Sequence, residues 1–301
     1  MVDPLAEVVT LLQPGASSSK LVSARGPWRV RRSEAGEVFY CLILDGVCRL
    51  AAAGHDPIAL QKGDFALVPS AYDFMASSLK PPPADTRPVA RLDGELRLGV
   101  QRGPPDVRML IGHCTFGSPD ATLLVSLLPR LVHLRDQRRL GTLVELVREE
   151  SRERRPAREV ILARLLEVLL IEALRSTAGA RAASGLLGGL ADERVAVAIR
   201  RMHERPTKPW SVVQLAKEAG LSRSTFFERF SQAVGVAPME YLLGWRMALA
   251  KDLLRRKGVT VGEVAEHVGY SSASTFSVAF TRHVGLPPRH YARKQAESPN
   301  P

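Results

Sequence analysis

Few histidines in the first 190 residues could bind a metal ion. The histidines of this region are His55, His113 and His133, and none is paired with another at the spacing of metal ligands. We therefore predict no metal site, no cofactor and no catalytic residue, so that the protein is not an enzyme. A metal-dependent enzyme remains an alternative.

Cys41 and Cys48 could instead form a redox pair. They flank Asp45–Gly46 in the stretch CLILDGVCRL, and an Asp-Gly pair between two apolar runs is a strong hairpin signal. The hairpin would make the thiols diagonal neighbours on one sheet face, about 7–8 Å apart, which is long for a disulfide. We favour two buried apolar side chains, with a cysteine-based redox regulator as the alternative.

The basic residues of the chain indicate an anionic partner. The formal net charge is +11, and residues 191–301 contain 17 Lys and Arg against 10 Asp and Glu, which predicts binding to a polyanion such as DNA. The most apolar segment is interrupted by Arg164, Glu167 and Glu172, so no membrane span is predicted. The start of the chain lacks a signal-peptide pattern. We expect a cytoplasmic protein without a membrane partner.

Two similar stretches, residues 211–234 and 260–284, each predict a helix-turn-helix unit. Each opens with a capping box, runs through a short helix to a glycine, and places two phenylalanines four residues apart on the next helix. A rigid helix beginning at Pro238 between them would let one chain read two successive major-groove segments, about 34 Å apart. The matching residues are Ser211, Gln214, Gly220, Phe226 and Phe230 in the first copy and Thr260, Glu263, Gly269, Phe276 and Phe280 in the second.

The N-terminal part changes its periodicity along the chain. Short β-branched and aromatic runs between residues 28 and 112 predict a small barrel or sandwich. After residue 120 the apolar period becomes helical, and we predict helices over 121–134, 143–154 and 158–176. The small, Gly-rich segment 179–189 is predicted to be an interdomain linker.

The helix predicted over 158–176 is apolar around most of its circumference. A helix of this kind is buried within its domain or against another chain. We place Leu162, Leu166 and Leu169 near an interface with a second copy and expect a homodimer.

These motifs resemble a known family. Residues 190–293 resemble the DNA-binding domain of the AraC/XylS transcription regulators, through WSVVQLAKEAGLSRSTFFERF, GVAPMEYLLGWRMALAKDLL and VAEHVGYSSASTFSVAFTRHVGLPPRHY. The N-terminal part resembles the cupin-like sensor domain of some members, through YCLILDG, LQKGDFALVP and LLPRLVHL. The resemblance implies an α+β fold with two domains. Residues 1–178 would form a cupin-like β-barrel with following helices, and 190–301 an all-α domain with the two helix-turn-helix units.

The resemblance also implies a function. The protein would be a sequence-specific transcription regulator whose N-terminal domain senses a small molecule or another signal. Double-stranded DNA, an unidentified effector and RNA polymerase are the implied partners. Two competing hypotheses are a cupin-type metal enzyme tethered to DNA and a non-specific architectural DNA protein. Where members would carry metal-binding histidines, this chain has Cys41 and Phe74.

The family pattern assigns the outward faces of two helices to DNA. Members often have Arg at the positions of Glu228 and Val278, so guanine readout is not implied there. Phe227 either touches a thymine methyl or packs against the preceding helix. The implied DNA-binding residues are Arg223, Ser224, Thr225, Phe227, Glu228, Arg229, Ser272, Ala273, Ser274, Ser277 and Arg282.

Overall fold

The chain forms two compact units in a computed structural model. The structure describes residues 2–32, 37–52, 55–69, 74–90, 95–118, 121–126, 128–152, 155–177, 185–256 and 258–297. The β-rich unit comprises Gln13–Phe116 and Pro129–Gly179. The helical unit comprises Met1–Leu12, Gly117–Leu128 and Ala180–Pro301. Two segments that the sequence analysis placed in the sensor, 1–12 and 117–128, thus belong to the helical unit.

The predicted linker is helical in its second half. Gly185 precedes helix α5 (Leu186–Ala191), and Leu186 and Leu187 are buried. Small residues and glycines concealed this helix, because they resemble a flexible connection in composition. The part of the predicted linker before Gly185 lies outside the described residues.

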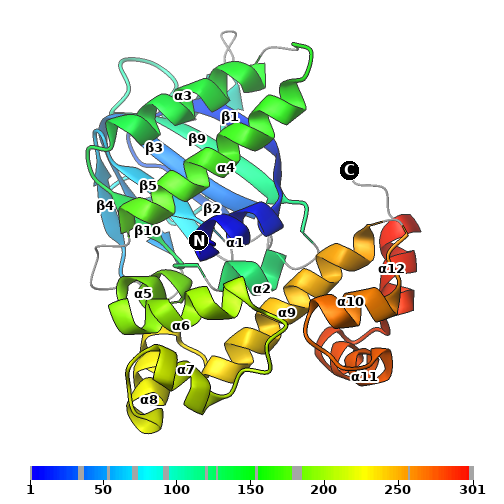
Figure 1. Cartoon of the computed structure of the whole chain (residues 1–301). Coiled ribbons are helices and arrows are strands. Elements are labelled where there is room, and N and C mark those ends of the chain that lie inside the picture. The colour runs from blue at the N-terminus through cyan, green and yellow to red at the C-terminus, as the bar shows by residue number, and fades with distance from the viewer. Residues whose placement is uncertain are drawn as a thin grey trace. The chain divides into compact units, whose positions relative to one another are not determined.

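The β-rich unit contains a curled sheet whose inner face forms the core (Figure 1). Its main path has the order β10-β5-β3-β9-β1-β8-β7, while β4 and β6 pair with β3, and β2 pairs with β6. This architecture confirms the cupin-like barrel. The strands are β1 (Pro14–Arg25), β2 (Arg29–Arg32), β3 (Glu37–Ala52), β4 (Ile58–Gln61), β5 (Phe65–Val68), β6 (Phe74–Ser77), β7 (Val89–Ala90), β8 (Leu96–Gly99), β9 (Val107–Phe116) and β10 (Val132–Leu134).

Asp45–Gly46 is a bulge within a long strand, so the predicted hairpin is wrong. Strand β3 continues through both residues, and its register with β9 shifts between Ile43 and Asp45. Gly46 has φ 79°, and a Cβ there would lie 1.9 Å from the Asp106 carbonyl oxygen. Only glycine fits this backbone approach. The bulge bends β3, which pairs with β5 and β9 before it and with β4 and β6 after it.

Two long helices, α3 (Arg138–Arg152) and α4 (Arg158–Thr177), pack on the sheet through β1, and α4 also packs on β10 (Figure 1). The single helix predicted over 121–134 is wrong in its second half. Helix α2 covers Ala121–Ser126, Pro129 follows, and Val132–Leu134 form β10 against β5. Pairing with a sheet edge outweighed the helical periodicity here.

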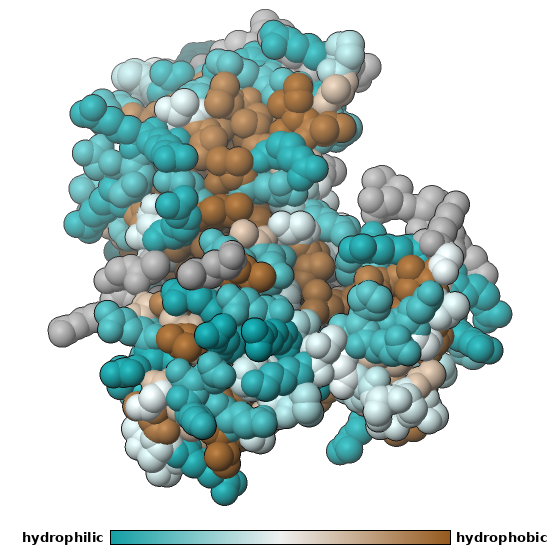
Figure 2. All heavy atoms as spheres, viewed as in Figure 1, coloured by the Kyte–Doolittle hydropathy of each residue, from teal (hydrophilic) through white to brown (hydrophobic). Residues whose placement is uncertain are grey.

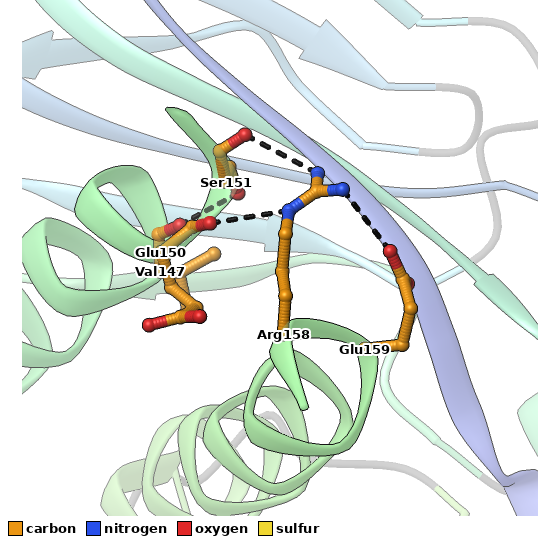
Figure 3. A network of polar contacts seen from close by, with 5 residues as sticks. All are labelled: Val147, Glu150, Ser151, Arg158 and Glu159. Atoms are coloured by element: carbon orange, nitrogen blue, oxygen red, sulfur yellow. Dashed lines mark hydrogen bonds and ion pairs between the residues drawn. The ribbon is translucent and has the colours of Figure 1, made fainter. Parts of the chain in front are cut away.

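Arg158 joins α3 to α4 (Figure 3). Its Nε donates to the Glu150 carbonyl and its Nη2 to the Ser151 carbonyl, both at 3.2 Å. Its Nη1 also donates to the Glu159 carboxylate at 3.1 Å. The guanidinium therefore satisfies carbonyls at the C-terminal end of α3 and ties the start of α4 to that end.

The leucines assigned to the dimer interface lie in the interior of the β-rich unit. Leu162, Leu166 and Leu169 are at most 1% exposed, on the side of α4 that packs against the sheet. The placement of these three residues at an exposed interface is therefore wrong. The periodicity showed that the helix has two apolar sides but could not show which one faces the sheet.

The remaining helices form the helical unit. Helix α1 packs on α2 and α6, and the others follow one another as two similar groups joined by the long α9. These helices are α1 (Pro4–Leu12), α6 (Glu193–Glu204), α7 (Val212–Glu218), α8 (Arg223–Val234), α9 (Pro238–Arg255), α10 (Val261–His267), α11 (Ala273–Val284) and α12 (Pro288–Glu297).

Candidate nucleic-acid interface

Both predicted capping boxes are present. The Ser211 hydroxyl accepts from the Gln214 N–H at 3.2 Å, while the Gln214 side chain accepts from the Ser211 N–H at 2.9 Å. Thr260 and Glu263 make the same reciprocal pair, at 3.2 and 2.7 Å. Each box starts a short helix at a defined residue, because it satisfies backbone donors that the helix itself leaves unpaired.

The turn to the second helix of each unit also repeats. Gly220 and Gly269 have positive φ, 65° and 84°. A serine then caps the next helix: the Ser222 hydroxyl accepts from Thr225 N–H, and the Ser272 hydroxyl from Thr275 N–H. The chain direction therefore changes in the same way in both copies, which orients α8 on α7 and α11 on α10 alike.

An aromatic triplet fills the interior of each unit. In the first, Phe226 and Phe230 have ring centroids 5.6 Å apart, and Tyr241 meets Phe230 edge-on at 5.8 Å. In the second, the corresponding distances are 5.4 Å for Phe276 and Phe280 and 5.5 Å for Phe280 and Tyr291. Neither tyrosine was predicted from the sequence. The signal was available, since each stands three residues after the proline that opens the next helix.

Helices α8 and α11 present most of the predicted DNA-binding residues to solvent. On α8, all six predicted side chains are exposed, and only the buried Phe226 interrupts the row. Phe227 is 44% exposed, so it does not pack fully against the preceding helix. Val278, at the position matching Glu228, is 71% exposed. The exposed predicted residues are Arg223, Ser224, Thr225, Phe227, Glu228 and Arg229 on α8 and Ala273, Ser274 and Arg282 on α11.

Six predicted residues are engaged within the protein. Ser224, Thr225 and Ser274 each make a hydroxyl contact with the serine that caps their helix. Ser272 is half-buried and caps α11, and the half-buried Ser277 donates its hydroxyl proton to the Ala273 carbonyl at 2.7 Å. Arg229 forms an ion pair with Asp192, the residue that caps α6. Burial alone would raise the pKa of Asp192, yet hydrogen bonds from Arg229 and the backbone outweigh it and lower that pKa. Any contact of these six with DNA would compete with existing hydrogen bonds.

A hollow of about 870 Å³ lies along the outer face of α11. Its lining includes Ser274, Val278 and Arg282 on α11 and the exposed Leu243 on α9. It therefore combines a cation, a hydroxyl and apolar side chains at the surface that the repeat assigns to DNA. Such a mixture can contact both a phosphate and the edge of a base pair.

A buried polar cluster joins α1 to α6 and α9. The His203 side chain on α6 is fully buried, and its Nδ1 lies 2.6 Å from a Glu7 carboxylate oxygen on α1. Its Nε2 lies 2.8 Å from the Tyr241 hydroxyl on α9, and its ring stacks on Trp245 with centroids 4.0 Å apart. Burial lowers the pKa of His203, although Glu7 opposes this effect. This cluster was not predicted from the sequence, because nothing local relates residue 7 to residue 203.

The three cysteines are all buried, and none forms a disulfide. Burial is the main cause that raises the pKa of the Cys41 and Cys48 thiols, the latter to about 12. Because β3 has no hairpin, the diagonal arrangement predicted for these two thiols does not exist. Among the described residues, no three His, Cys, Asp or Glu side chains gather as a metal site would require. No helix in the same ranges combines the length and apolarity of a bilayer span.

Known proteins resemble this chain along nearly its whole length. Residues 3–179 match the cupin family and residues 215–294 the helix-turn-helix domain family. An AraC-like transcription regulator of Streptomyces lividans is 36% identical over 97% of this chain and 98% of its own. Another, from Streptomyces antibioticus, is 34% identical over the same shares. The structure of the AdpA DNA-binding domain with a target DNA is 30% identical and covers 36% of this chain and 100% of its own, with TM-score 0.34. The chain therefore belongs to the AraC-like family of DNA-binding transcription regulators and carries a cupin-like domain.

Proposed function

We propose that one chain of this regulator reads two adjacent major-groove segments with α8 and α11, and that its β-rich unit senses a small molecule. The repeated geometry carries the first part of this proposal. Both helices have the same cap, the same glycine turn and the same aromatic interior. The outward side chains of α8 and α11 are therefore held in the same way in both units. Two helices that enter successive major-groove segments of one duplex need such matching support.

The outer faces of the two helices differ in chemistry. Arg223 can donate two hydrogen bonds to a guanine, and Glu228 can accept from a cytosine amino group. The matching positions on α11 are Ala273 and Val278, which can contact only the apolar part of a base pair. The two segments of the recognition site should consequently differ in sequence, so that the site is not a simple repeat.

The test selects genomic fragments on the full-length protein and maps the bound site by hydroxyl-radical footprinting. We expect two protected major-groove segments about one helical turn, roughly 10 base pairs, apart. Arg223→Ala should weaken binding by about 1–3 kcal/mol and relax preference within one segment only. Arg282→Ala should act on the other segment.

Arg164→Ala is the matched control, because it removes the same charge from an exposed arginine of the β-rich unit, ion-paired with Glu167. It should leave both segments unchanged. A single protected segment would refute reading by two helices. Equal, sequence-independent losses in all three variants would show that the arginines act only through net charge.

We also propose a homodimer formed through α3 and α4. Figure 2 shows apolar side chains gathered over these two helices. Leu146 and Val168 are each 43% exposed there, and Ile161 is 41% exposed. A second copy would remove this surface from water, with the same patch contributed by both chains.

Sedimentation tests the dimer directly. Replacing Ile161 and Val168 with Glu changes only exposed positions, so the fold should survive while charge enters the proposed apolar contact. We expect a wild-type dimer and a folded monomeric double variant. Val213→Glu, on the exposed face of α7, is the control and should remain a dimer. A monomeric wild type at tens of micromolar would contradict the proposal.

A further inference from the structure

The barrel of the β-rich unit contains a cavity of about 100 Å³ that is lined mainly by apolar side chains. Strand register explains the lining, because alternate residues of neighbouring strands point inward: Val30 pairs with Ala76, and Val22 pairs with Leu96. Among the described residues, no carboxylate lines the cavity. The apolar lining consists of Val22, Trp28, Val30, Phe39, Phe74, Ala76, Pro88, Leu96, Leu98 and Ile111.

Two cations stand at one end of this lining. Lys20 lies two residues before Val22 on β1, and Arg32 two residues after Val30 on β2, so both share the inner face of their strands. Both side chains are exposed, which places the charged ends towards water. Within the described residues, neither is ion-paired with a carboxylate.

A row of rings connects the strands that carry the cations. Arg32 pairs with Phe74 across β2 and β6, and the Phe74 and Phe39 centroids lie 4.2 Å apart. Phe39 in turn lies 5.5 Å from the His113 ring on β9, the strand on which Ile111 pairs with Lys20. The cationic end therefore borders an aromatic wall, and an occupant can meet both at once.

These features define the chemistry of an occupant. Apolar walls favour a hydrocarbon body, because its transfer out of water is favourable, while two unpaired cations favour one anionic group. The volume limits the body, since a cavity of about 150 Å³ holds benzene and this one is smaller, at about 100 Å³. A chain of about five carbon atoms fits, a single small ring is at the upper limit, and a lipid acyl chain is too large.

We propose that this cavity binds a small organic carboxylate, with its hydrocarbon body among the rings and its carboxylate at Lys20 and Arg32. The role of this acid as an effector rests on the proposed sensing function, but its binding does not. A neutral molecule of the same shape would leave the two cations without a counter-charge, so charge is the basis of selection.

The experiment titrates the full-length protein with four probes, pentanoate, benzoate and their neutral amides, by calorimetry and thermal shift. The carboxylates should bind with Kd near 1 mM or tighter, about tenfold or more below the amides. The double variant Lys20→Gln/Arg32→Gln should lose this advantage and bind acid and amide alike. Arg49→Gln, exposed on the outer face of β3, is the control and should keep it.

Ala76→Phe fills the cavity from a wall position and should abolish binding of all four probes, while the thermal transition shows that the variant remains folded. The inference is overturned if neither carboxylate binds at millimolar concentration, if acid and amide bind equally to wild type, or if the double variant binds as wild type does. Footprinting in parallel separates the two proposals. If the protein binds specific DNA but no acid, only the proposed cavity site is refuted. If the acid binds but leaves DNA affinity unchanged, only its role as an effector is refuted.

Discussion

Glu7 holds helix α1 to the helical unit through His203, so Glu7→Ala should weaken that attachment. The Nδ1–H of His203 would lose its acceptor at 2.6 Å inside a site where the imidazole is fully buried. A hydrogen bond to a charged group contributes about 1.5–3 kcal/mol, and partial exposure of Glu7 favours the lower end. With about 2–4 °C per kcal/mol for a unit of this size, we expect Tm to fall by roughly 3–8 °C.

Calorimetry of the full-length protein measures this change, with tryptophan fluorescence as a second probe because Trp245 stacks on His203. Glu7→Gln keeps an acceptor but removes the charge, so it should cost about half as much. Thr10→Ala changes the exposed face of the same helix and should stay within about 0.5 kcal/mol. If Glu7→Ala unfolds like Thr10→Ala, the contact does not stabilise the unit and the reasoning is wrong.

The same cluster gives stability a pH dependence. A neutral His203 can donate from Nδ1 to Glu7 and accept at Nε2 from the Tyr241 hydroxyl, whereas the protonated ring has no lone pair left for the latter. Burial lowers its pKa below the ordinary value of 6.5, despite the nearby carboxylates of Glu7 and Asp3. The unfolded chain therefore binds more protons below 6.5, and stability falls as pH decreases through the folded pKa.

The slope from this one group cannot exceed about 1.4 kcal/mol per pH unit. His203→Gln should flatten the dependence just below pH 6.5, which urea titrations at several pH values would show. An unchanged slope in that variant would mean that another group titrates.

Two further predictions concern the β-rich unit. Gly46→Ala should prevent correct folding of the unit or destabilise it by about 3 kcal/mol or more, because the bulge requires positive φ and a Cβ would meet the Asp106 carbonyl. Circular dichroism and calorimetry would detect the loss of structure or stability. Gly262→Ala is the control and should be tolerated, because its surroundings have room for a methyl group. Native protein at pH 8 should react very slowly with a thiol reagent, because Cys41 and Cys48 are buried and protonated. In urea, all three cysteines should react. Rapid labelling of the native protein would support the redox hypothesis instead.

The helical unit was largely predictable because its signals are local. A capping box spans four residues, and a glycine turn lies directly behind it, so sequence spacing alone specifies both. The caps at Ser211 and Thr260 and the turns at Gly220 and Gly269 are present as predicted. The same local information could not reveal Glu7 beside His203, because that contact depends on the path of the entire chain.

The β-rich unit shows where local signals fail. Asp45–Gly46 favours a tight turn, but pairing with β9 on one side made a bulge the better solution, and the glycine served the close approach of Asp106 instead. Leu166 shows a different limit. Periodicity identifies an apolar side of a helix, yet only the position of the sheet determines which side is buried.

The difference between the two outer faces bears on whether the protein reads sequence at all. A protein that binds only the DNA backbone needs cations on that surface and gains nothing from other residue types. The exposed positions 228 and 278 instead carry a glutamate and a valine. Phosphate repels the glutamate carboxylate, and the valine side chain has no charge with which to bind phosphate. Both side chains can contact base edges, Glu228 at a cytosine amino group and Val278 at a thymine methyl. Equal frameworks with unequal outer faces therefore favour recognition of a defined sequence over an architectural role.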